Sequence, residues 1–415
     1  MKKNIFTPAD ILLPESISLE NWSVIACDQF SSEIDYWERV RRLVGGDPST
    51  LNMIIPEAYL GDIDEESEIS KIRSAMDQYT MNGFLREISD SFVYVERTLA
   101  NGRVRRGLVG AVDLDDYSFD GSKAAILASE GTVLERLPAR IRVRRAVRLE
   151  VPHIIAFIDD KDMTVIEPLT KKAGNLQLLY GFDLMEGGGH IRGMRVCGYD
   201  AEYVELAMRA LHEKNDTLMV IGDGNHSLAA AKVYWDELKQ GLSAAERDTH
   251  PAGKALLEVN NVYDPSISFE AIHRVLYGVD RAEFLDALSR ALPEGGDYEL
   301  RWVSQEQSGA IGVAAGCIGD MLVMLQSFLD GFIERTGCRL DYIHDADALR
   351  KLAGAERSIG LMLPAMDKSE LFGTVGARGA FPKKSFSVGN ARDKRYYLEC
   401  RAIAGNPEFG IRNSE

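Results

Sequence analysis

The sequence predicts an α/β or α+β fold, in which mixed sheets carry flanking helices. Three observations support this class: a β-hairpin at 91–114, a strand–turn–helix segment at 218–240, and short strands that alternate with helices from residue 293 onward. A chain of 415 residues is too long for one ordinary core. We therefore expect an α/β region at 1–290 that carries a ligand site, followed by a smaller α/β region at 291–415.

The first 140 residues predict helices and one hairpin. Apolar residues at helical spacing indicate helices at 32–43 and 66–90. The β-rich runs 91–99 and 104–114 flank Asn101-Gly102, a dipeptide typical of a type I′ hairpin turn. Thr132 and Glu135 fit a capping box, and Pro138 can open the helix that follows.

The arginine-rich segment 140–148 concentrates positive charge in an acidic chain. On a helix Arg140, Arg144 and Arg148 would share one face, whereas on a strand Arg140, Arg142 and Arg144 would do so. Such a face can bind phosphate or carboxylate. It can also pair with the abundant Asp and Glu side chains, which is the commoner use of exposed arginines in acidic chains.

The second half of the chain predicts alternating elements. Residues 201–214 fit an amphipathic helix with Tyr203, Leu206 and Leu211 turned inward. A short buried strand at 218–221 and a helix at 227–240 come next, and Gly241 ends that helix. Further strands are expected at 256–262, 268–275, 300–303, 311–314, 321–325 and 395–403, and further helices at 327–335 and 346–353.

Composition excludes several functional classes. The formal net charge of −16 disfavours nucleic acid and anionic membranes as partners. No apolar run approaches the roughly 20 residues of a membrane helix. The five cysteines are scattered and form no Cys-x-x-Cys pair, so we expect buried thiols in a reducing cytoplasm. The seven histidines show no His-x-x-x-His spacing, and we predict no structural zinc site.

The segment that most indicates chemistry is Gly222-Asp223-Gly224-Asn225-His226-Ser227, between the strand and the helix. Its two glycines allow positive φ and a close approach of a ligand to the backbone. Free amides at a helix start, strengthened by the helix dipole, form an anion site. His226 near the positive helix end should be neutral, which suits a base or a hydrogen-bond donor. A capped helix after a tight turn would give the same pattern without chemistry.

This segment resembles the Asp-Gly-His-His-Arg motif of a bacterial and archaeal family known as domain of unknown function 1015. The sequence departs from that motif at Asn225, which replaces the first His, and at Ser227, which replaces the Arg. The loss of the Arg leaves phosphate clamping to another arginine. Further stretches that resemble the family, in order along the chain, are 105–110 with Asp116-Tyr117, 129–132, Asn260-Asn261, 272–274, 342–344 and 382–385.

The resemblance implies a core similar to the ParB/sulfiredoxin superfamily around 218–240. That superfamily includes DNA-partition proteins that use nucleotides, sulfiredoxins that use ATP, and kinases of free serine. A Gly/His/Arg turn at a helix start holds nucleotide phosphate there. The resemblance therefore implies phosphate or nucleotide handling, although a fold alone does not fix a reaction.

We predict an enzyme that transfers phosphate between a nucleotide and a small metabolite, with free serine or a similar hydroxy amino acid as the best acceptor. Mg²⁺ is expected to accompany ATP or ADP, with no metal bound by the protein alone. The alternative is a non-catalytic sensor of an anionic metabolite or nucleotide, in which binding changes the oligomeric state of a homo-oligomer. The predicted catalytic residues are Asp223, His226 and Glu130, and the predicted ligand-binding residues are Gly222, Gly224, Asn225, Ser227, Arg140, Arg144 and Lys384.

Overall fold

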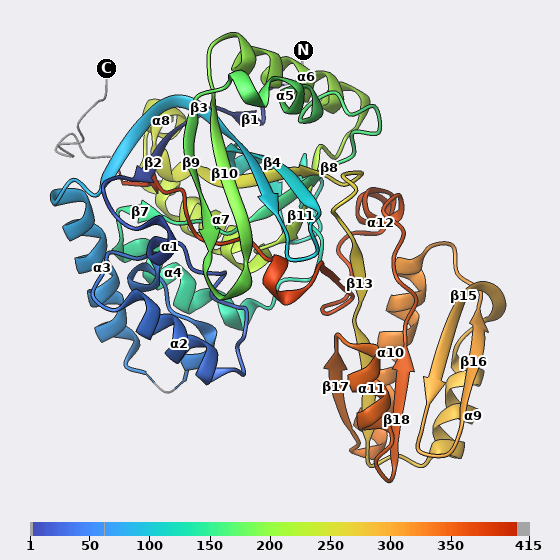
Figure 1. The fold of residues 1–415 in the computed structure, drawn as a ribbon. Helices are drawn as coiled ribbons and strands as arrows, with labels where there is room; N and C mark the ends of the chain where they lie inside the picture. Colours follow the sequence, from blue (N-terminus) through green and yellow to red (C-terminus); the bar gives the residue numbers. More distant parts are fainter. Residues whose placement is uncertain (1–2, 62, 405–415) are drawn as a thin grey trace. The chain divides into compact units, whose positions relative to one another are not determined.

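A computed structural model describes residues 3–61 and 63–404 and has a mixed α/β fold. The described chain forms two compact units. Unit 1 contains 3–128, without residue 62, together with 132–267 and 391–404, whereas unit 2 contains 129–131 and 268–390. The boundary that we predicted near residue 290 lies inside unit 2, and the chain returns to unit 1 after it (Figure 1).

Unit 1 is built on a mixed sheet of eleven strands. Its main path runs β5-β6-β11-β8-β12-β4-β3-β10-β9, while β1 pairs with β4 and β2 with β3. The pairs β5–β6, β6–β11 and β8–β12 are parallel and the other pairs are antiparallel. The strands are β1 (Phe6–Thr7), β2 (Ala9–Pro14), β3 (Leu85–Thr98), β4 (Val104–Asp113), β5 (Tyr117–Ser118), β6 (Ile126–Ala128), β8 (Ile155–Ile158), β9 (Leu178–Leu184), β10 (Gly189–Val196), β11 (Met219–Asp223) and β12 (Lys254–Asn261).

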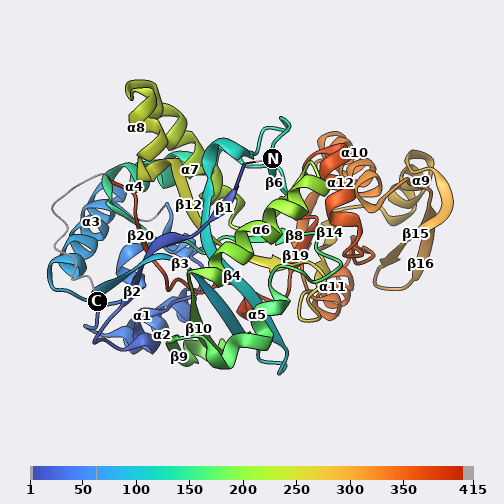
Figure 2. The ribbon, with the colours of Figure 1, turned by 90° about the horizontal axis from the view of Figure 1, so that it is seen from above.

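Both faces of this sheet are buried. Successive side chains of a strand point to opposite faces, so neighbouring residues of one strand belong to different apolar clusters. In β3, Phe92 and Tyr94 join one apolar cluster, whereas Val93 and Val95 join another. Helices α2 and α3 contribute to the second cluster, and α6 and α7 contribute to the first; Figure 2 shows α6 lying across β3 and β4. The helices of unit 1 are α1 (Leu19–Trp22), α2 (Ile34–Val44), α3 (Glu65–Met81), α4 (Leu137–Ala146), α5 (Glu167–Lys172), α6 (Tyr199–Lys214), α7 (Asn225–Leu238) and α8 (Ala244–Thr249).

The segment 391–403 completes unit 1 after unit 2. Arg97, which is 1% exposed, donates to the backbone carbonyls of Gly188, Arg392, Asp393 and Lys394. Four carbonyls from two segments are thus held by one guanidinium. Only β20 (Arg401–Ala402), which pairs with β7 (Leu149–Glu150), is regular strand here, so the strand predicted at 395–403 is mostly irregular extended chain.

Buried ion pairs hold the rest of this C-terminal segment. Arg395 lies 3.0 Å from the Glu258 carboxylate on β12 and donates to Glu399 at 2.6 Å. Arg401 donates to Glu150 at 2.7 Å. Breaking a buried pair by removing one partner costs roughly 3–5 kcal/mol, because the other charge stays buried. The segment is therefore an integral part of unit 1.

Unit 2 contains a five-stranded antiparallel sheet of order β16-β15-β18-β14-β17 and a separate β13–β19 pair. Phe284 of α9 and Phe332 of α10 pack edge to face with ring centroids 5.1 Å apart. The elements are β13 (Phe269–Ala271), β14 (His273–Tyr277), α9 (Arg281–Ala291), β15 (Glu294–Val303), β16 (Ser308–Val313), α10 (Ile318–Thr336), β17 (Arg339–Ile343), α11 (Ala346–Ala353), β18 (Ser358–Met362), α12 (Glu370–Arg378) and β19 (Phe386–Val388) (Figure 1).

Several predicted details are wrong. The helix predicted at 66–90 ends at Met81, and β3 already begins at Leu85. The strand predicted at 321–325 is part of α10. The hairpin exists, but its turn is not type I′: only Gly102 has positive φ, and Leu99 and Arg103 close a three-residue loop.

Two predictions of side-chain placement are also wrong. On α6, Tyr203 and Leu206 are 40% and 60% exposed, while Val204, Met208 and the predicted Leu211 are buried. The capping box at 132–135 is absent, since a 3₁₀ turn begins at Leu134 with no side-chain cap. Of the cysteines within the described residues, Cys338 and Cys400 are buried, whereas Cys197 is exposed.

Candidate functional site

The strand–turn–helix segment is present as predicted. β11 lies inside the sheet between β6 and β8, and α7 begins at Asn225. Gly224 is the N-cap residue with φ of 80°, a left-handed conformation that strongly favours glycine. A Cβ at Gly222 would lie 2.2 Å from the Phe157 ring, so that position also excludes a side chain. The two glycines thus let the chain turn sharply from the sheet into α7.

The anion site that we predicted at the start of α7 stays a prediction. Because Gly224 has no side chain, it provides no side-chain cap for the first turn of the helix. The Nε2 atom of His226 accepts a hydrogen bond from the Val133 amide at 3.2 Å. Nε2 is therefore unprotonated in this arrangement. His226 ties the loop before α4 to the first turn of α7.

A buried acid–base cluster lies at the same turn. The Asp223 carboxylate is 3.5 Å from Lys394 Nζ, and both side chains are about nine-tenths buried. Burial raises the pKa of the Asp28 carboxyl; the nearby charge of Asp223 adds to the rise, whereas His153 and Lys394 oppose it. Burial lowers the pKa of His153, although Asp28 and Asp223 act in the opposite direction. These four residues form what we call the acid–base cluster.

Two carboxylate oxygens of this cluster are buried and have no hydrogen-bond partner among the described residues: Asp28 Oδ1 and Asp223 Oδ2. Asp223 Oδ2 is also the oxygen that faces Lys394 Nζ at 3.5 Å. A buried unsatisfied oxygen is costly and calls for an explanation. A proton, a metal ion or a substrate hydroxyl would each satisfy it.

Cys27 borders the cluster but is not a nucleophile. Its backbone amide donates to the Tyr397 hydroxyl at 3.1 Å. Burial raises the pKa of its thiol to about 12, and the charge of Asp28 adds to the rise. Since the thiolate is the reactive form, this cysteine is inert near neutral pH.

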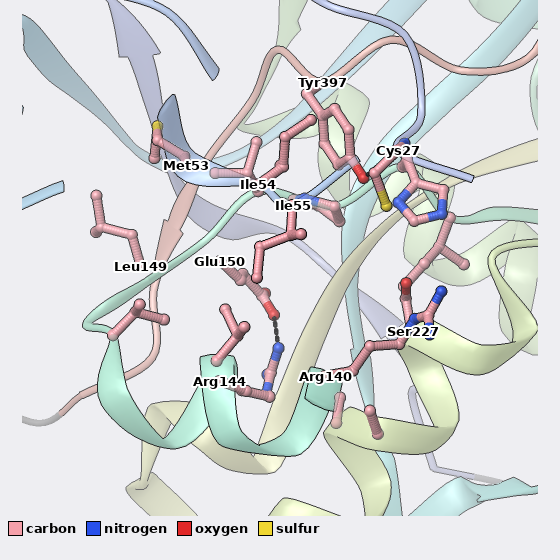
Figure 3. Close-up of a pocket in the computed structure, with 18 of the residues that line it drawn as sticks. Cys27, Met53, Ile54, Ile55, Arg140, Arg144, Leu149, Glu150, Ser227 and Tyr397 are labelled. Atoms are coloured by element: carbon pink, nitrogen blue, oxygen red, sulfur yellow. Dashed lines mark hydrogen bonds and ion pairs between the residues drawn. The ribbon is translucent and has the colours of Figure 1, made fainter. Parts of the chain in front are cut away.

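A largely apolar pocket of about 170 Å³ opens beside the cluster (Figure 3). Cys27, His153 and Tyr397 line one part of it, together with Ser227 of α7. Figure 3 shows Arg140 and Arg144 reaching it from α4, while Ile54 and Ile55 cover the opposite side. The pocket therefore connects the start of α7 with the arginine-rich helix.

The arginine-rich segment is helical, and Pro138 lies in its first turn as predicted. Arg140 and Arg144 share a face, but Arg148 lies beyond the end of α4. Arg140 pairs with Glu57, and Arg144 donates to Glu150 at 2.9 Å. Their neighbours Arg142 and Arg145 form exposed pairs with Glu65 and Glu237. All four arginines therefore form ion pairs, which is one of the two uses that we left open, and anion binding by Arg140 and Arg144 stays a prediction.

The remaining predicted site residues, Glu130 and Lys384, belong to unit 2. The Glu130 carboxylate accepts hydrogen bonds from the backbone amides of Lys384 and Ser385 at 3.4 and 3.2 Å. Burial raises the pKa of Glu130, although these amides oppose the rise. The carboxylate thus anchors a loop of unit 2, and its predicted role as a base remains untested.

The comparisons with known proteins identify the family. A family model described as "Protein of unknown function (DUF1015)" matches residues 10–365. The chain belongs to this family. The match includes Asp28, His153 and the turn at 222–227, whereas Lys394 and Tyr397 lie beyond the matched residues. No curated protein matches the chain.

Solved structures provide only a weak likeness. SbnI from Staphylococcus aureus, with a C-terminal truncation, is 9% identical with a TM-score of 0.37, over 68% of this chain and 82% of that one. A mutant free serine kinase in complex with AMP is 14% identical with a TM-score of 0.39, over 71% and 92%. A conserved hypothetical protein from Pyrococcus furiosus is 13% identical with a TM-score of 0.35, over 69% and 93%. At these TM-scores the likeness supports no functional conclusion for this chain.

The sequence did not point to three members of the acid–base cluster. Asp28, His153 and Lys394 lie in irregular segments between regular elements. None belongs to a motif or shares a spacing with Asp223, so no local pattern links them. The one available signal was the density of charge and aromatic rings at 392–397, unusual for a buried segment.

The described residues contain no group of three or more His, Cys, Asp or Glu side chains arranged to hold a metal ion. Within the same residues no helix is long and apolar enough to cross a membrane.

Proposed function

We propose that this protein is a phosphotransferase that moves a phosphoryl group between a nucleotide and the hydroxyl of a small metabolite. One observation carries the proposal: only Gly224 separates Asp223 from the N-terminus of α7, and Asp223 belongs to a buried cluster of two carboxylates, a lysine and a histidine. A helix N-terminus favours phosphate. The carboxylates provide the base that an attacking hydroxyl needs.

The proposed roles follow from the environments of the side chains. The first-turn amides of α7 and the Arg140 guanidinium hold the phosphate charge. Asp28 acts as general base, because its raised pKa makes it a stronger proton acceptor than an ordinary carboxylate. It takes the proton of the acceptor hydroxyl as the new O–P bond forms and the bond from phosphorus to the nucleotide oxygen breaks. Lys394 lies beside Asp223 and adds positive charge near the transferred group.

Mg²⁺ would enter with the nucleotide. In proteins it is commonly held by one or two carboxylates together with substrate phosphates. The Asp223 carboxylate, whose Oδ2 has no hydrogen-bond partner among the described residues and lies 3.5 Å from Lys394 Nζ, would be the protein ligand. The ion would neutralise phosphate charge during transfer.

The test is a direct assay of phosphoryl transfer. Protein with Mg²⁺ and ATP, or ADP, is incubated with serine and related hydroxy amino acids, and products are read by phosphorus NMR. Asp28→Asn should lower turnover at least a hundredfold, within the usual range for a lost general base, while nucleotide affinity stays similar. Asp162→Asn is the matched control, since that carboxylate is 77% exposed.

Two outcomes would reject the proposal. Full turnover in Asp28→Asn would remove that residue from the reaction. Tight nucleotide binding without turnover of any acceptor would favour the alternative, a non-catalytic sensor that is stabilised by a ligand it never consumes.

A further inference from the structure

We propose that the pocket beside α4 binds a carboxylate attached to a compact apolar body, and that Arg144 receives the carboxylate. The binding of such a carboxylate does not depend on the proposed function. The further step, that this ligand is an apolar hydroxy acid that accepts the phosphoryl group, rests on the proposed function.

Arg144 offers an unused edge for a carboxylate. Its Nη1 donates to Glu150 Oε2 at 2.9 Å, which fixes the guanidinium. Its Nε and Nη2, which lie side by side on the opposite edge, are buried and have no hydrogen-bond partner among the described residues. Two parallel N–H donors on a planar cation match the two oxygens of a carboxylate. Arg144 is thus oriented on one edge and vacant on the other.

The charges around Arg144 also favour an anion. Glu150 is shared between Arg144 and Arg401, so the three buried side chains carry a net positive charge. Arg401 is satisfied, since it also donates to the carbonyls of Pro251 and Lys254 at 2.9 and 2.6 Å. The donors without a partner therefore belong to Arg144, and the net positive charge of the three side chains lies beside them. A buried charge without a partner is costly, and a bound carboxylate would balance it.

The other walls define the body of the ligand. Ile55, Val143, Val147 and Leu149 all line the pocket, together with alanines of α7. Its volume of about 170 Å³ is close to that of an engineered apolar cavity, roughly 150 Å³, that binds benzene. An apolar body about the size of one ring fits these walls, whereas the polar side chain of free serine leaves most of them uncovered. Ser227 and His153 line the same pocket, so a hydroxyl on that body can lie near the start of α7.

Calorimetric titration with phenylacetate and its neutral isostere phenylacetamide tests the proposal. Phenylacetate should bind the wild-type protein, and Arg144→Gln should weaken it about tenfold or more, as expected for a lost charge-assisted pair. Phenylacetamide should bind weakly to both. Arg145→Gln is the matched control, because Arg145 is the next residue on α4 but is 59% exposed and pairs with Glu237. Its phenylacetate affinity should equal that of the wild type.

Arg144→Lys provides a second variant if Arg144→Gln folds poorly. The lysine keeps the positive charge but lacks the two parallel N–H donors. This variant should therefore bind phenylacetate more weakly than the wild type does, and its binding of phenylacetamide should stay weak. Equal affinities for the acid and the amide, or no binding of phenylacetate to the wild type, would overturn the proposal. Competition by adenosine that depends on Arg144 would assign the pocket to a nucleobase and also overturn it. Arg144-dependent phenylacetate binding in a protein without phosphotransferase activity would keep this inference and reject only the proposed function.

Discussion

Gly224→Ala is expected to destabilise unit 1 by two separable effects. The φ of 80° costs a residue with a side chain about 1–2 kcal/mol. The new Cβ would also lie 2.9 Å from Ile154 Cγ1 and 3.0 Å from its Cα, and such overpacking adds about 1–3 kcal/mol. Gly102 isolates the first effect, since it has the same φ with nothing within 4 Å of a Cβ. Gly241→Ala has neither problem and should gain about 0.4–1 kcal/mol from reduced freedom of the unfolded chain.

The three variants are compared by urea unfolding, followed by tryptophan fluorescence. Since Trp302 is the one tryptophan in unit 2, a Trp302→Phe background makes Trp22, Trp37 and Trp235 report on unit 1 alone. The free energy of unfolding should fall in the order Gly241→Ala, Gly102→Ala, Gly224→Ala. Equal losses for the last two variants would refute the close packing of Gly224 on Ile154. A variant at Gly224 that binds nucleotide as well as the wild type would refute the role of the turn.

Three further outcomes are expected. His226→Ala should cost about 1 kcal/mol of stability, because Val133 loses its acceptor; an unchanged melting temperature would contradict that bond. Arg97→Met should cost roughly 3 kcal/mol or more and raise hydrogen exchange at 391–403, since buried carbonyls lose their donor; unchanged exchange would show that the segment is held otherwise. Below pH 6.5 the unfolded chain protonates His153 before the folded protein does, so stability should fall as the pH drops from about 6.5 towards the lowered folded pKa. His153→Asn should reduce that fall between pH 6.5 and 5 in urea titrations, and an unaltered pH dependence would exclude His153 as its source.

Elements with local signals could be predicted from the sequence. β11 and α7 were predicted because a short apolar run, two glycines and an amphipathic stretch follow one another. The first turns of α10 were misread as a strand, since a short and wholly apolar run has no periodicity that distinguishes the two structures. The start of β3 was misread as helix because polar and apolar residues at 85–90 fit either period.

The candidate site was only half predictable for a different reason. Gly224, Ser227 and Arg140 stand in motifs, and motifs are local. Asp28 and Lys394 approach Asp223 only after the sheet has formed and the C-terminal segment has docked on it. Contacts of that range are set by tertiary packing, and a single sequence contains no record of them. The ion-pair partners of the arginines on α4 could not be predicted for the same reason, and the sequence left open whether this segment is a helix or a strand.

The return of the chain to unit 1 after residue 390 has a consequence for synthesis in the cell. Arg97 has no carbonyls of 392–394 to bind, and Asp223 has no lysine beside it, until residues 392–394 have been synthesised and have left the ribosome. At ordinary elongation rates, synthesis of 268–390 takes on the order of ten seconds. During that interval Arg97 on β3 and Glu258 on β12 lack their partners from the segment 391–403. Unit 2 can fold in the same interval. Nascent chains stalled near residue 390 should therefore be cleaved by proteases within unit 1 more readily than chains that include residues 391–404.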